Sequence, residues 1–250
     1  MNSLVRVMAI LAAVCWCRSL FAQEMNIMDN RTLRMIVVSS KGDVHGVEEL
    51  LHEGMNIEST DVIGNTPLIF AARYGRVEEV RYLIGRGANV NARSSTGGTP
   101  LREAVNKMNP ATVRLLLDAG ATVDAMDLGG ETAVFYAVRY GFIPALEMLL
   151  TQGANPDIAD NRGDTPLTYA VRQSLTRPDH WQRIIGLLIT HGADPTILNH
   201  QGENAVCIAR RQGKSPIYKM LRDYDSRKTG CHALAGELIG AVGSREETFE

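Results

Sequence analysis

Apolar residues in the middle of this chain follow a helical spacing that stops at a glycine. Val80, Leu83 and Ile84 occupy positions i, i+3 and i+4, and Gly87 follows them. This spacing places apolar side chains on one face of an α-helix, and a glycine just beyond it is a common helix terminator. The pattern predicts an amphipathic helix that ends at Gly87.

A shorter helix is predicted immediately before this one. Thr66 can cap its first turn, and Pro67 suits the first helical position, where no backbone N–H is needed. Leu68 and the two following alanines form a narrow apolar face, which allows close approach of neighbouring helices. Gly75 is expected to end this helix with a positive φ angle.

This two-helix pattern returns at a fixed interval of 33 residues. The Thr-Pro-Leu signal and its variant stand at Thr66-Pro67-Leu68, Thr99-Pro100-Leu101, Thr132-Ala133-Val134 and Thr165-Pro166-Leu167. The glycine-alanine pair after the second helix stands at Gly87-Ala88, Gly120-Ala121, Gly153-Ala154 and Gly192-Ala193. Because the last step of this second series is six residues longer, an insertion is predicted between Pro166 and Gly192. One such unit cannot bury its apolar face alone, so the units are expected to stack.

The unit D-x-x-G-x-T-P-L-x-x-A, followed by V-x-x-L-L-x-x-G-A-x-x-N, strongly resembles the ankyrin repeat. The resemblance implies an all-α ankyrin-repeat solenoid of about six helix-turn-helix repeats with short hairpin loops. The expected repeats are 28–60 as a degenerate cap, 61–93, 94–126, 127–159, 160–198 with the insertion, and 199–225 as a second cap. Residues 226–250 form a C-terminal tail, either a short helix against the last repeat or disordered.

The chain departs from the family pattern at two places. The histidine that follows Thr-Pro-Leu in the family is replaced by Ile69, Arg102, Phe135, Thr168 and Cys207. We therefore expect the inter-repeat hydrogen bond implied by the family to be absent. Met108 replaces the inter-helix glycine, and Asn109-Pro110 supplies an alternative cap, which predicts a rearranged turn.

The insertion carries a tryptophan that could serve either binding or packing. Trp181 stands with Ile184, Ile185 and Leu188 at i, i+3, i+4 and i+7. That periodicity favours the buried face of a lengthened helix over a binding residue.

The N-terminal segment has the features of a secretory signal. Arg6 precedes the uninterrupted apolar run from Val7 to Cys17, and Ala22 is a candidate cleavage position. The run is shorter than the ~20 residues that span a bilayer, and no later segment is long enough. We predict that residues 1–22 are a signal peptide and that the protein is periplasmic or secreted. The alternative is a hydrophobic N-terminus on a cytosolic protein.

Two cysteines remain after removal of that segment. Cys207 and Cys231 are an even number, which is compatible with one disulfide outside the cytoplasm. Spacing alone does not decide between a disulfide and two separate thiols, and both interpretations stand.

The resemblance places the ends of the first helices on the concave face of the solenoid. The two positions before the inter-helix glycine hold Ser40, Arg73, Asn106, Arg139, Arg172 and Arg211, then Lys41, Tyr74, Lys107, Tyr140, Gln173 and Gln212. Arginine and tyrosine are enriched at interface hot spots. We predict a stripe that binds an acidic or carboxylate-rich partner through Arg73, Tyr74, Lys107, Arg139, Tyr140, Arg172 and Arg211. The alternative is a permissive exposed position without a binding role.

Other functions find little support in the residues. The net charge of −2 argues against nucleic acid, and no Gly-x-Ser-x-Gly or His-Glu-x-x-His motif is present. The spacing of His191, His200, Cys207 and Cys231 fits no compact zinc pattern. We expect a monomer that has no enzymatic activity, cofactor, metal or membrane span. The predicted function is an exported non-catalytic protein-binding scaffold. The alternative is a structural or stabilising subunit of a larger envelope complex, which would expose a large apolar patch.

Overall fold

The computed structural model describes residues 30–174, 177–213 and 216–225, and in this part of the chain twelve helices are arranged in six pairs. The first helices of the pairs, here called inner helices, are α2 (Asn30–Lys41), α4 (Pro67–Arg73), α6 (Pro100–Asn106), α8 (Ala133–Tyr140), α10 (Pro166–Gln173) and α12 (Ala205–Arg211). The outer helices are α3 (Val44–His52), α5 (Val77–Gly85), α7 (Pro110–Asp118), α9 (Ile143–Thr151), α11 (Pro178–Thr190) and α13 (Pro216–Asp225). The predicted all-α solenoid of about six repeats is confirmed.

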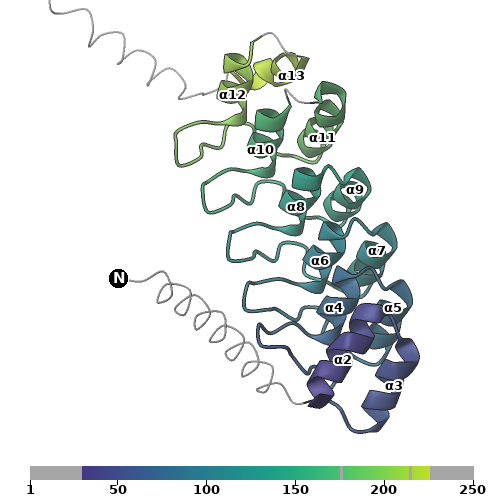
Figure 1. The fold of residues 1–250 in the computed structure, drawn as a ribbon. Coiled ribbons are helices and arrows are strands. Elements are labelled where there is room, and N and C mark those ends of the chain that lie inside the picture. Colours follow the sequence, from purple (N-terminus) through teal and green to yellow (C-terminus); the bar gives the residue numbers. More distant parts are fainter. Residues whose placement is uncertain (1–29, 175–176, 214–215, 226–250) are drawn as a thin grey trace, which may run out of the picture.

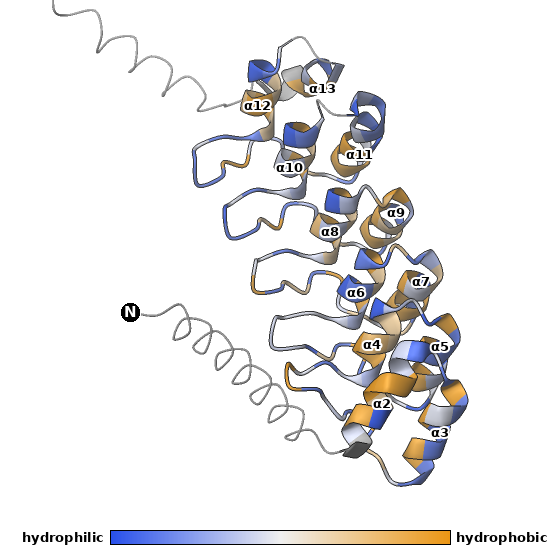
Figure 2. Ribbon diagram, viewed as in Figure 1, coloured by the Kyte–Doolittle hydropathy of each residue, from blue (hydrophilic) through white to orange (hydrophobic). Residues whose placement is uncertain are grey.

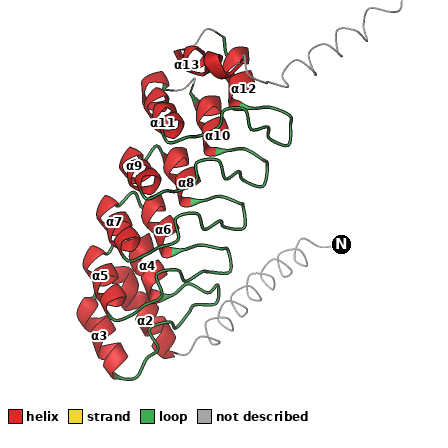
Figure 3. Cartoon of the chain, turned by 180° about the vertical axis from the view of Figure 1, so that it is seen from behind, coloured by secondary structure: helices red, strands yellow, loops and turns green. Residues whose placement is uncertain are grey.

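The two kinds of helix form two layers, and each helix packs against its counterpart in the next repeat. Figure 1 shows the stack curving from α2 and α3 at one end to α12 and α13 at the other. Figure 3 shows the loops between pairs projecting to one side, beside the inner helices. This arrangement brings the ends of the inner helices and the hairpin loops together along one face.

The inner helices begin as the threonine pattern predicts. The Thr66 hydroxyl accepts a hydrogen bond from the Ile69 backbone N–H, and Thr99, Thr132 and Thr165 cap their helices in the same way. Asn204 takes this position in the last repeat. Each cap satisfies a backbone N–H that has no partner within the helix.

The core runs continuously between the two layers. Ala71, Ala104, Ala137 and Ala170 recur once per repeat and are fully buried, so the inner helices approach closely. Leucines of the outer helices, such as Leu83 and Leu116, are also fully buried. In Figure 2 the outer helices α3, α5 and α11 carry both orange and blue segments, as expected for helices with one buried and one exposed face.

The turn between the paired helices is the same in the third repeat as in its neighbours. Gly75 has φ 68° and Met108 has φ 58°, so the methionine takes the left-handed conformation of a glycine. The Asn109 N–H donates to Ala104 O, as Arg76 does to Ala71 O. The prediction of a rearranged turn was wrong, because the hydrogen bonds of the surrounding turn hold the methionine in this unfavourable conformation. Asn109 does cap α7, as predicted.

The hairpin loops are built around a side-chain turn rather than strands within the described residues. Asp61 Oδ1 accepts from the backbone N–H groups of Ile63 and Asn65, and Asp127, Asp160 and Asn199 repeat this arrangement. Neighbouring loops are also joined, because Ser95 N–H donates to Ile63 O. These bonds hold successive loops in register.

The insertion lengthens the outer helix of the fifth repeat. Trp181 is 8% exposed and lies in α11 with the fully buried Ile184, Ile185 and Leu188. The core interpretation of this tryptophan is confirmed. In the part of the chain that the structure describes, no helix is both long and apolar enough to cross a membrane.

Some predictions concern residues outside the described ranges. These are the signal peptide 1–22, the tail 226–250 and Cys231. They remain predictions.

Candidate functional site

Four of the seven predicted binding residues are arginines in the last turn of an inner helix, and their side chains run back along that helix. Each meets the residue eight positions earlier, just before the helix cap: Arg73 with Asn65, Arg139 with Glu131, Arg172 with Asp164 and Arg211 with Glu203. Helical side chains lean toward the N-terminus of their helix, which directs each arginine to this partner.

The pairing differs in detail among the repeats. Arg172 binds Asp164 through two hydrogen bonds of 2.6 and 3.0 Å. Arg73 Nε instead donates to Glu103 Oε2 in the next repeat, at 3.1 Å. The arginines therefore form a ladder of ion pairs with acids of the same face, and little of their charge remains uncompensated.

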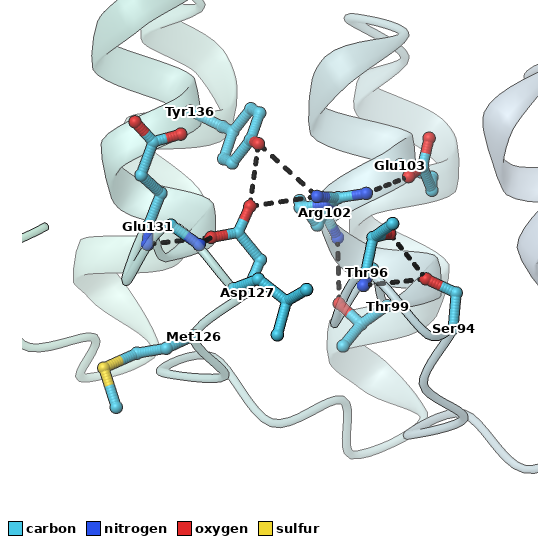
Figure 4. A network of polar contacts seen from close by, with 12 residues as sticks. Ser94, Thr96, Thr99, Arg102, Glu103, Met126, Asp127, Glu131 and Tyr136 are labelled. Atoms are coloured by element: carbon cyan, nitrogen blue, oxygen red, sulfur yellow. Dashed lines mark hydrogen bonds and ion pairs between the residues drawn. The ribbon is translucent and has the colours of Figure 1, made fainter. Parts of the chain in front are cut away.

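A network of polar side chains joins the third and fourth repeats (Figure 4), and Arg73 of the second repeat meets it at Glu103. Arg102 Nη2 donates to Glu103 Oε1 at 2.5 Å, and its Nη1 donates to Asp127 Oδ2 at 3.0 Å. The Tyr136 hydroxyl donates to the same Asp127 oxygen at 2.8 Å. Because Asp127 belongs to the next repeat, the prediction that no inter-repeat hydrogen bond forms at the family's histidine position was wrong for Arg102. The long cationic side chain of Arg102 reaches the hairpin loop of the fourth repeat from that position.

The pKa shifts favour an ion pair between Asp127 and Arg102 beside a neutral Tyr136. Burial alone would raise the pKa of Asp127. Hydrogen bonds from two backbone N–H groups, the Tyr136 hydroxyl and Arg102 outweigh it, so the pKa is lowered. Burial and the hydrogen bond to Asp127 raise the pKa of Tyr136 to about 12. Sequence reasoning missed this network, although Arg102 at the histidine position was its signal.

Arg139 is held more firmly than its pairing with Glu131 alone would imply. Its guanidinium carbon lies 5.5 Å from the ring centre of Phe135, 5.4 Å from that of Tyr136 and 5.8 Å from that of Tyr169. A pocket of ≈410 Å³ lies beside it, with Arg162 and Arg172 also on its wall. Aromatic faces attract a cation within about 6 Å, so Arg139 acts as a fixed part of the wall.

The two tyrosines of the predicted stripe are exposed and contact aromatic rings of the inner helix in their own repeat. Tyr74 is 44% exposed and Tyr140 is 43% exposed. Tyr74 stacks on Phe70 with ring centres 6.5 Å apart, and Tyr140 lies 6.1 Å from Tyr136 at an angle of 37°. Each exposed ring is thus supported on one side and open on the other. Lys107, also exposed, makes no ion pair among the described residues.

The repeated caps, the left-handed turns and the stacked pairs agree with a comparison of the sequence with family models. The model described as ankyrin repeats in three copies matches residues 34–127 and 109–180, and the single ankyrin repeat matches residues 162–200. The chain belongs to the ankyrin repeat family. Ankyrin repeats indicate a protein-binding scaffold.

One solved structure and one curated protein are similar to this chain. The crystal structure of an ankyrin repeat domain from Acinetobacter baumannii is similar to this chain, with a TM-score of 0.69 and 26% identity. The similarity covers 75% of this chain and 95% of that one. A 50-residue segment is 42% identical to integrin-linked protein kinase 1 of Arabidopsis thaliana. That match covers 19% of this chain and 10% of the plant protein.

The remaining chemistry-bearing groups are potential metal ligands and one cysteine of the described chain. No cluster of three or more potential metal ligands occurs among the described residues. Cys207 is disulfide-bonded, and its partner lies outside the described ranges. The pairing of Cys207 with Cys231 therefore remains a prediction.

A buried carboxyl group lies in the outer helix of the second repeat. Glu79 has no exposed surface, and neither of its carboxylate oxygens makes a hydrogen bond of good geometry, although the Ser39 hydroxyl lies nearby. Burial raises the pKa of Glu79 to about 8, against smaller lowering effects of Ser39 and Arg76. The equivalent position holds Thr112 in the third repeat and Ala145 in the fourth.

Proposed function

We propose that the protein is an exported, non-catalytic scaffold whose concave face binds an acidic surface of another protein. The observation that carries this proposal is that the arginines and the tyrosines of the predicted stripe are held differently. Arg73, Arg139 and Arg172 are fixed by acids, while Tyr74 and Tyr140 stay exposed on supporting rings. Tyrosines that are rigid before binding lose little entropy in a complex and are common hot-spot residues.

The arginines serve this surface in two ways under the proposal. They hold the inner-helix ends in place, and they offer the remaining N–H groups of their guanidinium forks to a carboxylate of the partner. Arg211 is the most accessible of them, with 66% of its side chain exposed. Lys107 adds a cation without an acidic neighbour in the described part of the chain.

The binding test compares wild-type protein with a Tyr74→Ser, Tyr140→Ser variant in affinity capture from an envelope extract. An Arg81→Ser, Arg114→Ser variant is the control, because both arginines are exposed on outer helices. We expect one protein to be retained by the wild type and the control and lost by the tyrosine variant. Purification of that protein and a direct titration complete the test. Equal retention by all three proteins would remove the tyrosines from the binding site.

Export is tested separately. The proposal rests on the sequence of residues 1–22, with Ala22 as the cleavage position. The full-length chain is expressed with a C-terminal tag, the cell is fractionated, and the N-terminal residue of the recovered protein is determined. We expect a shortened chain beginning near Gln23 in the periplasmic or secreted fraction. A full-length chain in the cytosol would contradict export.

A second candidate function is that of an obligate subunit in a larger envelope complex. Several apolar side chains on the hairpin loops favour it: Val62 is 63% exposed, Leu128 is 70% exposed and Met126 is 48% exposed. Native mass measurement after gentle extraction distinguishes the two functions. A scaffold is found partly as the free monomer, whereas an obligate subunit is found only at the mass of the complex.

A further inference from the structure

The inner helices of the first four repeats end in a column of alternating lysine and tyrosine. Lys41, Tyr74, Lys107 and Tyr140 each precede the left-handed residue of the turn, and all four are exposed. We call these residues the Lys/Tyr column. In the sixth repeat the same position holds Gln212, whose side-chain amide donates to Val171 O at 3.2 Å. The column with accessible side chains therefore covers the first four repeats.

Among the residues at the inner-helix ends, the uncompensated charge lies on the lysines of the column rather than on the arginines beside them. Neither Lys41 nor Lys107 forms an ion pair within the described residues, whereas Arg73 and Arg139 do. A ligand that approaches the column meets two free cations and two open aromatic faces in alternation.

Two neighbouring members of the column, Tyr74 and Lys107, are continuous on the surface. The Lys107 side chain lies across the turn of the preceding repeat, with its Cγ 3.3 Å and its Cε 3.7 Å from where a Cβ on Gly75 would stand. Gly75 directly follows Tyr74, so the lysine chain and the tyrosine belong to one strip. A larger residue at Gly75 would separate them.

The spacing of the column selects the conformation of its ligand. Packed helices lie about 8–10 Å apart, which is the approximate step from one repeat to the next. A polyproline-II chain advances about 9 Å per turn of three residues, so every third side chain faces the same way. In a β-strand, by contrast, residues three apart point to opposite faces. A polyproline-II segment thus matches the column in both length and direction.

We propose that the Lys/Tyr column binds an acidic polyproline-II segment of a partner protein, with an acidic residue and a proline alternating at every third position. The acidic side chains meet Lys41 and Lys107, and the prolines pack on Tyr74 and Tyr140. Aromatic surfaces are the common docking sites of proline-rich segments, because such segments lose little entropy on binding. This inference rests on the proposed function and specifies the partner of the same face.

The test uses the full-length protein and a fluorescein-labelled ten-residue peptide. Glutamate occupies its first and seventh positions, proline its fourth and tenth, and serine or glutamine the remainder. The control peptide has the same composition with glutamate and proline two residues apart. We expect fluorescence anisotropy to show that the in-register peptide binds at least about tenfold more tightly, since the control loses contacts of hot-spot type.

Matched variants test which residues are responsible. Lys107→Glu and Tyr140→Ala are each expected to weaken the in-register peptide by about tenfold. Arg114→Glu makes the same change of net charge on the outer helix α7 and is expected to leave binding unchanged. Unfolding midpoints in urea confirm that the variants are folded.

Equal binding of the two peptides, or no binding of either, would overturn the inference. An equal loss for Arg114→Glu and Lys107→Glu would also overturn it, because net charge alone would then explain binding. These outcomes leave the proposed function standing if a captured partner is still lost by the Tyr74→Ser, Tyr140→Ser variant. Failure of that capture would instead refute the proposed function.

Discussion

The second and fourth repeats both end their inner helix with Arg-Tyr-Gly, yet their arginines are held by different parts of the molecule. Arg73 reaches forward to Glu103 in the third repeat. Arg139 stays with Glu131 of its own repeat and lies over three aromatic rings. The exposed tyrosines that follow are nevertheless presented alike, at 44% and 43% exposure.

The outer helices of these two repeats also differ. The second repeat buries the carboxyl group of Glu79, whereas the fourth has the small Ala145 at the same position. A common surface motif therefore does not require a common interior. In a solenoid each repeat is supported mainly by its neighbours, so interiors can diverge while the surface period is kept.

The largest expected loss of stability comes from breaking the polar network around Arg102, which the second repeat joins through Arg73. Arg102→Ala leaves Asp127, whose side chain is 7% exposed, without an ion-pair partner among the described residues, and leaves Glu103, 4% exposed, with Arg73 alone. We expect a loss of about 3 kcal/mol in the free energy of unfolding, measured with urea, because unpaired buried charges are costly. Hydrogen exchange should accelerate more in α4 than in α9. A loss no greater than that of the exposed control Arg114→Ala would contradict the role of the network.

The buried carboxyl group of Glu79 predicts that the free energy of unfolding depends on pH, and this dependence arises in the second repeat. The folded pKa of Glu79 is about 8, well above the ordinary value of 4.5. The unfolded chain therefore releases its proton first, and stability falls as the pH rises from about 4.5 to 8. We expect Glu79→Gln to match wild type near pH 4 and to be more stable by about 4–5 kcal/mol near pH 8.5. A pH-independent difference between the two proteins would refute the shifted pKa.

Replacing each arginine in turn sharpens the comparison. Arg139→Ala removes an ion pair and contacts with three rings, whereas Arg73→Ala removes an ion pair and a contact with the single ring of Phe70. We expect costs of about 2 kcal/mol and about 1 kcal/mol, respectively. Thermal unfolding of the two variants measures this difference. A double-mutant cycle of Arg73 with Glu103 then isolates the contact between repeats. Equal losses of stability in the two variants would show that the additional ring contacts of Arg139 contribute little.

The smallest expected effect on stability concerns the third repeat, which lies between the two repeats that carry Arg-Tyr-Gly. Met108 holds φ 58° where Gly75 and Gly141 hold 68° and 66°. Met108→Gly should relieve this conformation and stabilise the protein by about 1 kcal/mol. The melting temperature reports the change. A destabilised variant would mean that contacts of the methionine side chain outweigh its backbone strain.

Much of the fold could be predicted because its determinants are local and repeated. Thr66 and its counterparts cap helices in any surroundings, and alanines such as Ala71 mark the narrow inner face. The turn at Met108 was predicted wrongly because backbone hydrogen bonds of the surrounding turn, such as that from Asn109 N–H to Ala104 O, hold this residue at a positive φ. The residues of the predicted stripe lie at the inner-helix ends, as their place before the turn implies, and their role in binding stays a prediction. The acids that meet the arginines of the stripe were not anticipated.

The sequence by itself determined the period, the helix pairs and the positions that face outward, since these follow from spacing and capping within 33 residues. Only the tertiary structure decided which charges remain free. Glu103 meets Arg73 from 30 residues away, and Asp127 meets Arg102 from 25. Such pairs depend on how far one repeat is shifted against the next, which is set by packing of the whole stack. For this reason the two lysines of the Lys/Tyr column remain without an ion pair among the described residues, whereas the more numerous arginines at the inner-helix ends are held by acids.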